Sequence, residues 1–340
     1  MNAIVYAQNG TPDVLQWKEV ATPALGDDEV LIKLCAASVN ILDLGVLKGV
    51  PPWVRLLVRL LFGARTPKPK VFGFDLAGRA EKVLGSDIAG RVEAVGKRVK
   101  GFQPGDEVFG GNLLAGGGFA EQVCAVEDSL ALKPVNISFE DAAAVPIAAI
   151  TALQGLRDQG RIERGQKVLV DGASGGVGTF AVQIAKSFGA EVTAVCSTRN
   201  VDTARSIGAD TVIDYTRENF TRSGQRYDLI LAANAYHSMF DYRRALSRDG
   251  TYVWAGGKPS PAVMFLGPLL SLIGRRKIRY FLAKLNKKDL VFLKDLLETG
   301  KVAPVIDRRY PLSNAAEALR YLGEGHAQGK VVLTMEHSGH

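Results

Sequence analysis

The sequence predicts an α/β protein in which a doubly wound parallel sheet is joined to a β-barrel-like domain. The main observation is residues 167–199, which read as strand, glycine turn, helix and strand. Further strands and helices alternate after this unit, as they do in a parallel sheet covered by helices. Residues 1–34 instead form short apolar pieces between turn residues, which is typical of barrel strands. A chain of 340 residues is too long for one ordinary core, so two domains are expected.

The glycine turn is the first candidate binding site. It follows a short apolar strand at 167–170, and apolar residues from Val177 to Phe188 recur at steps of three and four, which predicts a helix with one buried face. Backbone N–H groups of a glycine turn at the start of a helix can approach a pyrophosphate closely. The sequence therefore predicts a dinucleotide site, with a plain tight turn as the alternative. The candidate contacts are Ser174, Gly175, Gly176, Val177 and Gly178.

The end of the second strand indicates which dinucleotide binds. A carboxylate there accepts from the ribose 2′-hydroxyl of NAD, whereas cationic and hydroxyl groups suit the 2′-phosphate of NADP. The segment 196–200 contains Ser197 and Arg199, and the first carboxylate comes only at Asp202. Arg199 can form charge-assisted bonds to a phosphate dianion. We therefore expect NADPH as the cofactor; an ordinary surface arginine is the alternative.

Composition narrows the function classes and the compartment. The net charge is +7, but the basic residues are scattered and no aromatic-interleaved stripe suggests nucleic acid as a partner. Three distant cysteines fit a reducing compartment without disulfides. Residues 1–6 begin a strand directly, which leaves no room for a signal peptide, and the longest apolar run, 262–274, is too short to span a bilayer. A cytoplasmic protein is expected.

Two apolar segments admit several interpretations. Val54–Phe62 reads as a short helix of Leu and Val with Arg55 and Arg59 one turn apart, and residues 261–277 read as an apolar helix with a basic end. Docking of the first helix on its own domain is the simplest explanation. Covering an apolar pocket, peripheral membrane contact and dimer packing remain open.

Residues 71–94 contain an internal repeat. The twelve residues from Val71 are echoed by the twelve from Val83, and seven positions are identical. Two copies do not make a solenoid. We interpret them as a local duplication in which the second copy forms the barrel strand, because it continues directly into Val95-Gly96, and the first is an inserted loop or hairpin.

The remaining elements follow from caps and periodicity. Ser138 and Asp141 form a capping box, so a helix is expected there that carries Thr151 and continues towards Leu156. The expected later strands are Thr211–Tyr215, Asp228–Ala233, Thr251–Ala255 and Ile278–Ala283, and the helical pieces between them are Val201–Ile207 and Met239–Leu246. A helix at Lys287–Glu298, a strand at Val302–Ile306, a helix at 313–323 and a strand at Val331–Met335 complete the chain, the last three rejoining the first domain.

Several motifs together resemble the medium-chain dehydrogenase/reductase superfamily, in its zinc-independent quinone oxidoreductase (zeta-crystallin-like) branch. They are Ser38-Val-Asn40-x-x-Asp43, the glycine-rich pattern at 85–96, Gly105-Asp106-x-Val108, Thr151-Ala152, Ala173–Gly178 and Gly329–Val332. The resemblance implies a GroES-like β-barrel catalytic domain at 1–150 with the duplicated segment 71–94, a Rossmann NADP-binding domain at 151–284, and a C-terminal return to the catalytic domain at 285–340. It also implies a homodimer.

Departures from the zinc-dependent relatives bear on the chemistry. Those relatives place a cysteine ligand where this sequence has Asn40 and a His-Glu pair where it has Ser86-Asp87. None of the four histidines stands at a matching position, so no metal is expected. Without a Lewis acid, nothing stabilises the alkoxide that forms during the oxidation of a simple alcohol. Hydride transfer to a quinone or an α,β-unsaturated carbonyl is therefore expected, and a zinc-free alcohol dehydrogenase is disfavoured.

The resemblance also implies roles for single residues. Asn40 would donate to the substrate carbonyl oxygen beside the nicotinamide, or simply hold its loop, and Asp43 and Lys48 lie on the same loop; these three are the catalytic candidates. Gly45 stands where a tyrosine often occurs, which leaves the proton source open. A dinucleotide-binding scaffold with little turnover is the competing interpretation. Further cofactor contacts are expected from Thr151, Tyr215, Asn234, Gly256, Gly257, Phe281, Leu282, Ala283 and Lys330.

Overall fold

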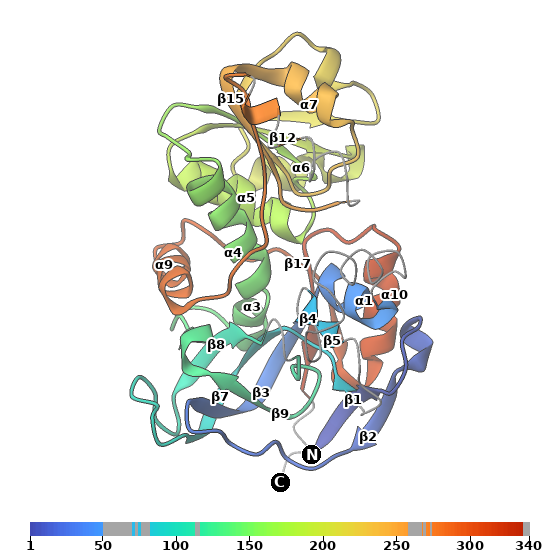
Figure 1. Ribbon diagram of the computed structural model, residues 1–340, viewed down its shortest axis with the longest axis vertical. Helices are drawn as coiled ribbons and strands as arrows, with labels where there is room; N and C mark the ends of the chain where they lie inside the picture. Colours follow the sequence, from blue (N-terminus) through green and yellow to red (C-terminus); the bar gives the residue numbers. More distant parts are fainter. Residues whose placement is uncertain are drawn as a thin grey trace.

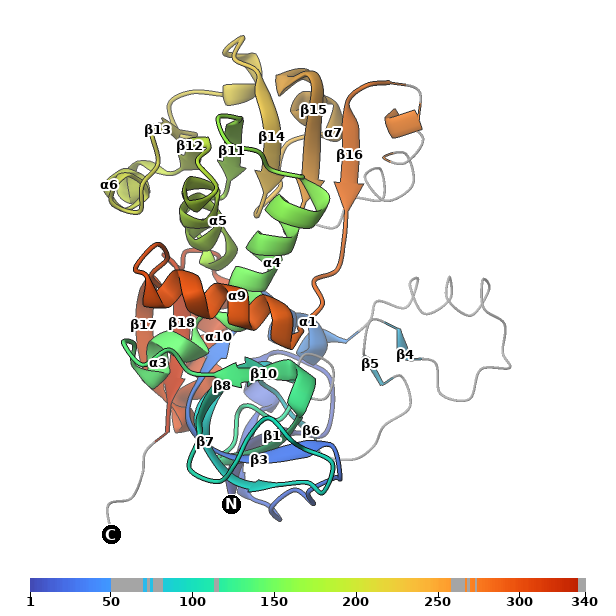
Figure 2. The same cartoon turned by 90° about the vertical axis from the view of Figure 1, so that its left-hand side faces the viewer.

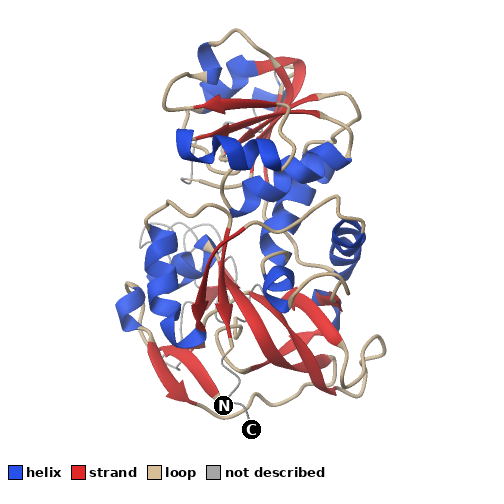
Figure 3. Cartoon of the chain, turned by 180° about the vertical axis from the view of Figure 1, so that it is seen from behind, coloured by secondary structure: helices blue, strands red, loops and turns tan. Residues whose placement is uncertain are grey.

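Two sheets organise the chain, one above the other along its long axis. The computed structural model describes residues 1–49, 70–71, 74–75, 82–112, 116–257, 267, 270–272 and 274–335 (Figure 1). Seen from behind, the parallel sheet lies above the larger β-rich part, and helices pack at the junction (Figure 3). The described part of the chain is thus an α/β structure with a barrel-like and a Rossmann-type half.

The parallel sheet has six strands in the order β13-β12-β11-β14-β15-β16. The order reverses at β11, between β12 and β14, and a ligand crevice opens at the carboxyl ends of strands at such a point. These ends face the β-rich half, as the arrow of β16 shows in Figure 2. The strands are β11 (Lys167–Asp171), β12 (Glu191–Cys196), β13 (Thr211–Asp214), β14 (Tyr227–Ala232), β15 (Leu246–Trp254) and β16 (Lys277–Tyr280).

Helices bury the two faces of this sheet. Phe180, Ala181 and Ile184 of α5 (Gly176–Ser187) belong to the core on one face, as the three-and-four spacing predicts. Tyr242 of α7 (Met239–Ala245) packs into the core on the other face. This half also contains the helix α6 (Val201–Ser206).

The β-rich half contains both early and late segments of the chain. Its main sheet has the order β10-β8-β7-β3-β18-β17 with β9 on β3, and β2-β1-β6 form a second sheet. Strand β18 pairs antiparallel with β3, from Val331 opposite Val39, so the expected return of the tail is confirmed. The strands are β1 (Asn2–Tyr6), β2 (Gln16–Glu19), β3 (Glu29–Val39), β6 (Lys82–Val83), β7 (Asp87–Val95), β8 (Glu107–Gly111), β9 (Gln122–Val126), β10 (Leu130–Leu132), β17 (Ile306–Pro311) and β18 (Lys330–Thr334).

The helix after Ser138 is shorter than expected. Ser138 Oγ accepts from Asp141 N at 3.0 Å and caps α3 (Phe139–Ala143), as the capping box predicts. The prediction of one helix running towards Leu156 is wrong. Pro146 has no N–H with which to continue α3, and it instead begins a separate helix, α4 (Pro146–Leu153). A π-helical turn, η3 (Gln154–Gln159), follows α4.

The second copy of the repeat supplies the barrel strand, because β7 pairs with β3 and β8. The first copy contributes β5 (Phe74–Asp75), which pairs with β4 (Lys70–Val71), and most of its other residues lie outside the described ones. Val54–Phe62 and most of 261–277 also lie outside the described residues.

The tail follows the expected order with one shift. Helix α9 has the predicted bounds Lys287–Glu298, and α10 spans Ala315–Gly323. The prediction of a strand at Val302–Ile306 is wrong, because β17 begins only at Ile306. The Gln183 side chain binds both backbone groups of Ala303: its Oε1 accepts from Ala303 N at 2.8 Å, and its Nε2 donates to Ala303 O at 2.9 Å. This segment is therefore bound to α5 instead of pairing as a strand.

Gln183→Leu should lower the free energy of unfolding by about 2–3 kcal/mol, because it leaves the Ala303 N–H and C=O unpaired between the two halves. Urea denaturation measures this loss. The matched Gln103→Leu, at an exposed position, should change it by less than about 0.5 kcal/mol. Equal stability of the two variants would contradict the bridging role.

Candidate active site

A buried carboxylate lies at the centre of a polar network between the two halves. Asp87, the first residue of β7, is fully buried. Its Oδ2 accepts from Ser38 Oγ at 2.8 Å, Asn40 Nδ2 at 3.0 Å and Lys330 Nζ at 3.2 Å. Its Oδ1 accepts from Ile147 N at 2.9 Å, in the first turn of α4. These four donors compensate the burial of the charge.

Lys330 joins this network to the glycine turn. Its side chain is 3% exposed, and its Nζ lies 2.7 Å from Asn40 Oδ1. A Cβ on Gly176 would approach Lys330 Cδ to 3.0 Å, and Gly175 pairs with Gly329 as an isolated bridge. The Lys330 stem therefore passes directly beside the turn, while its ammonium is bound to Asn40 and Asp87.

Asn40 and Asp43 open the short helix α1 (Ile41–Lys48). Asp43 accepts from Asn40 N at 2.7 Å and from Ser86 Oγ at 3.2 Å. Burial raises the pKa of Asp43 to about 7, against the lowering effect of the Asn40 N–H bond, and the Asp87 charge raises it further. Lys48 is exposed at the opposite end of α1. The structure therefore brings Asn40, Asp43 and Lys330 together but leaves Lys48 on the surface.

The glycine turn has the shape that a pyrophosphate needs. A Cβ on Gly178 would lie 2.1 Å from Gly172 O, so only glycine lets α5 approach the turn this closely. Gly175 has open space in its Cβ direction, with the nearest atom, Gly172 O, 3.6 Å away. Ser174 and Val177 are half-buried on either side. The turn thus leaves a cradle at the N-terminus of a twelve-residue helix.

Arg199 lies just after the end of β12, where the 2′-phosphate of NADPH would bind. Its Nη2 donates to His326 O at 2.7 Å, and it forms no ion pair with any residue the structure describes. Ser197 Oγ accepts from Asn200 Nδ2, but Thr198 Oγ1 is bound to Asp214. An exposed guanidinium and one hydroxyl therefore remain for an anion.

The other expected cofactor residues divide into two groups. One lies at the carboxyl edge of the parallel sheet: Tyr215, Asn234, Gly256 and Gly257, the last bridged to Ala235. The other lies at the junction and is mostly occupied with packing. Thr151 Oγ1 donates to Ile147 O within α4, Phe281 and Ala283 pack on the core, and Leu282 is exposed.

Sequence reasoning missed a further buried acid, Asp171, the last residue of β11. Its carboxylate accepts from Tyr242 Oη, and Tyr242 stacks on Tyr252 with ring centroids 4.6 Å apart. The Asp171 backbone O accepts from Ala233 N and Asn234 N, so this residue joins the ends of β11 and β14. Burial raises its pKa to about 7, although the Tyr242 bond lowers it. A carboxylate directly before the glycine turn was the available signal.

The described residues lack both a group of metal-binding side chains and a membrane-spanning helix. Among them, no three His, Cys, Asp or Glu side chains are grouped so that they could hold a metal ion. Within the same residues, no helix is both long and apolar enough to cross a membrane.

Comparison with known proteins gives matches along the chain. Residues 26–135 match a family model described as alcohol dehydrogenase GroES-like domain, and residues 207–333 match one described as zinc-binding dehydrogenase. The chain is 36% identical to 2-methylene-furan-3-one reductase of Solanum lycopersicum and 34% to the chloroplastic NADPH-dependent alkenal/one oxidoreductase of Arabidopsis thaliana; each alignment covers 98% of this chain and 79% of the relative. The solved quinone oxidoreductase from Coxiella burnetii superposes with a TM-score of 0.80 at 29% identity, covering 98% of this chain and 99% of that one.

The raised pKa of Asp171 gives a testable pH dependence. A folded pKa near 7 lies above the unfolded value, so its stabilising contribution is present at low pH and is lost as the pH rises from about 4 to about 7. Asp171→Asn should remove up to about 1.4 kcal/mol per pH unit from the slope of unfolding free energy in this window. Denaturation at several pH values measures the slope, and exposed Asp202→Asn is the control. Parallel curves for Asp171→Asn and wild type would contradict the assignment.

Proposed function

The chain belongs to the medium-chain dehydrogenase/reductase family, in its quinone oxidoreductase branch, and we propose that it reduces quinones and α,β-unsaturated carbonyls with NADPH. The observation that carries this proposal is the buried ammonium of Lys330, held between the glycine turn and the Asn40–Asp87 pair. The relatives named alkenal/one oxidoreductase and 2-methylene-furan-3-one reductase support the substrate class.

Lys330 is proposed to stabilise the charge that develops on the acceptor. NADPH, when bound, supplies the hydride. Two of the three ammonium N–H bonds are accounted for by Asn40 Oδ1 and Asp87 Oδ2, which leaves one for a substrate oxygen. A fixed positive charge in a buried site stabilises a developing enolate or quinolate oxygen strongly, because no solvent has to reorganise. Lys330 would thus serve as the electrophilic group.

Asn40 is proposed to position Lys330. Its Nδ2 donates to Asp87 and, more weakly at 3.5 Å, to Ser38 O, while its Oδ1 accepts from Lys330. The amide is therefore bonded at both ends. This arrangement favours the loop-holding role over direct donation to the substrate carbonyl, and Asp43 supports it by capping α1 at Asn40 N.

Zinc-independence is also proposed, from the chemistry of the side chains at this place. Asn40, Ser86 and Asp87 stand where the resemblance puts zinc ligands, and the one carboxylate among them already pairs with Lys330. A dication there would meet an ammonium at close range, which is unfavourable in a buried site. Extensive dialysis against a chelator should leave turnover unchanged.

Two competing functions make different predictions. A dinucleotide-binding scaffold would bind NADPH without turning over any acceptor, and a zinc-free alcohol dehydrogenase would oxidise simple alcohols. The buried Lys330 disfavours a mere scaffold, because its third N–H bond and its position beside the glycine turn suit contact with a reacting group.

The oligomeric state and the cellular location of the protein are further parts of the proposal. We propose a small-molecule substrate, a homodimer and a cytoplasmic location, with peripheral membrane contact through 51–70 or 261–277 as an option. The division 1–150, 151–284 and 285–340 is kept as a working domain description, although α4 crosses its first boundary.

Coenzyme choice tests the proposed NADPH site. Arg199→Glu should lower kcat/KM for NADPH by about 10- to 100-fold, because it replaces an attractive charge at the 2′-phosphate by a repulsive one, and should change kcat/KM for NADH little. The measurement is NADPH or NADH consumption with a panel of quinones and enones. Arg205→Glu, whose arginine pairs with Asp202 on α6, is the control. Unchanged discrimination would contradict the cofactor site, and no turnover of any acceptor would contradict the function.

Lys330 is tested by separating kcat from KM. Lys330→Met should lower kcat by about 100-fold or more and leave KM for NADPH within about threefold, because the ammonium acts on the developing charge. Lys330→Arg should retain part of the activity. A Lys330→Met enzyme with the kcat of the wild type would rule out this role.

A further inference from the structure

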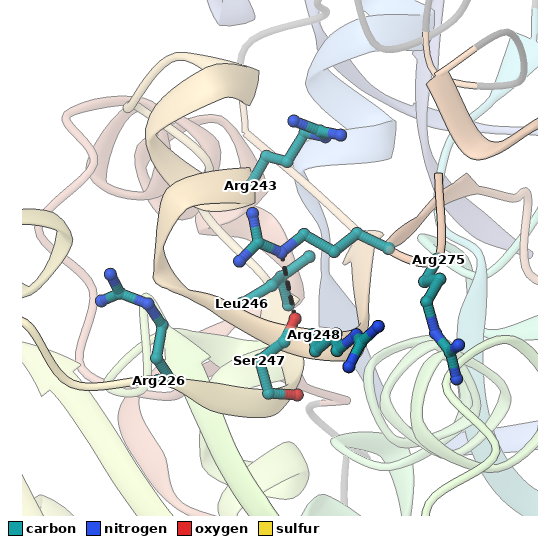
Figure 4. A pocket seen from close by; sticks show the side chains of 7 residues that line it. Arg226, Arg243, Leu246, Ser247, Arg248 and Arg275 are labelled. Carbon is teal, nitrogen blue, oxygen red and sulfur yellow. Dashed lines mark hydrogen bonds between the residues drawn. The ribbon is translucent and has the colours of Figure 1, made fainter. Parts of the chain in front are cut away.

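Five arginines line one pocket at the far end of the parallel sheet. The pocket has a volume of about 450 Å3, which is the size of a small-molecule site, and Figure 4 shows its lining from close by. Its lining residues are Arg226, Arg243, Leu246, Ser247, Arg248, Arg275 and Arg276.

The fold gathers these arginines from distant segments. Arg226 directly precedes β14, Arg248 is the third residue of β15, and Arg276 directly precedes β16. These strands are parallel neighbours, so their amino ends meet at one edge. The glycine turn follows the carboxyl end of β11 and lies at the opposite edge of the same sheet. The pocket is therefore separate from the proposed cofactor site.

The positive charge in this pocket is largely uncompensated. Arg275 pairs with Asp249, but the other four guanidiniums form no ion pair with any described residue. Arg226 donates to Gly224 O and Gln225 O, and Arg276 donates to Ser247 O at 3.0 Å, which fixes both side chains by backbone contacts only.

Arg243 adds a direct sign of a missing partner. Its Nε is buried and has no hydrogen-bond partner among the described residues. Its Nη2 would lie 3.3 Å from a Cβ on Gly274, so glycine at 274 lets the guanidinium lie close to the chain. A buried N–H without an acceptor is unfavourable, so the Arg243 guanidinium is not compensated by any described residue.

We propose that this pocket binds a ligand bearing two or more phosphate groups. Guanidinium forks bind phosphate oxygens in pairs, and four unpaired forks exceed what one monophosphate needs. None of the described residues that line the pocket is aromatic, so they provide no stacking surface for nucleic acid bases. The shared chemistry is a polyphosphate group, carried by a soluble metabolite or by a lipid headgroup.

Calorimetric titration of inorganic tripolyphosphate into the full chain, saturated with NADPH, tests the proposal. We expect one binding event per chain that weakens as salt is raised. Arg243→Gln/Arg276→Gln should weaken it at least about tenfold, while NADPH turnover stays unchanged. Arg244→Gln is the matched control, because Arg244 is the next residue on α7, pairs with Asp241 at 3.0 Å and does not line the pocket.

A second arm distinguishes the two sources of phosphate. Phosphatidylcholine vesicles containing phosphatidylinositol 4,5-bisphosphate, whose headgroup carries more than one phosphate, are sedimented with the wild type and with the double variant. Vesicle binding that the double variant loses assigns the pocket to a lipid headgroup; tripolyphosphate binding without vesicle binding assigns it to a soluble ligand. Absence of saturable binding to both probes, or an equal loss in Arg244→Gln, would overturn the proposal.

Discussion

The buried pair of Asp87 and Lys330 is the interaction on which the active-site region depends. A carboxylate with no solvent access needs compensation, and Asp87 receives it from β3, α1, α4 and β18 at once. Removing one partner of such a pair leaves an uncompensated charge and typically costs about 3–5 kcal/mol. The pair therefore fixes the relative positions of segments that come from both ends of the chain, and it does so beside the glycine turn.

Local patterns predicted the parallel half well. The glycine turn, the helix face of α5 and the carboxyl edge of the sheet all follow from spacing within a few dozen residues, and the structure places them as expected. The helix α9 was found at its predicted bounds because Leu290, Leu293 and Leu297 repeat at helical steps. Pro146 is the exception, because this local helix breaker was overlooked and the expected single helix is in fact α3 and α4.

Other predictions from the sequence were wrong where residues far apart in the chain determine the local structure. Ala303 lies outside a strand because Gln183, 120 residues earlier, binds its backbone, and no pattern near residue 303 reports this. Lys330 was expected as a cofactor contact, but its ammonium lies on Asn40 and Asp87, since a buried carboxylate attracts a cation more strongly than open solvent does. Asp171 was overlooked for the same reason: its partner Tyr242 lies on another element. Such pairings require the tertiary structure.

The strand that carries Lys330 has a further consequence for how the protein is made. Lys330 follows Asn40 by 290 positions, so the ribosome completes the parallel half before the lysine exists. Until then β3 lacks β18 as a neighbour, and Asp87 has no ammonium to neutralise it. Pairing over such a separation is slow in folding. Nascent chains should therefore complete the glycine turn and its helix well before the proposed electrophile is in place.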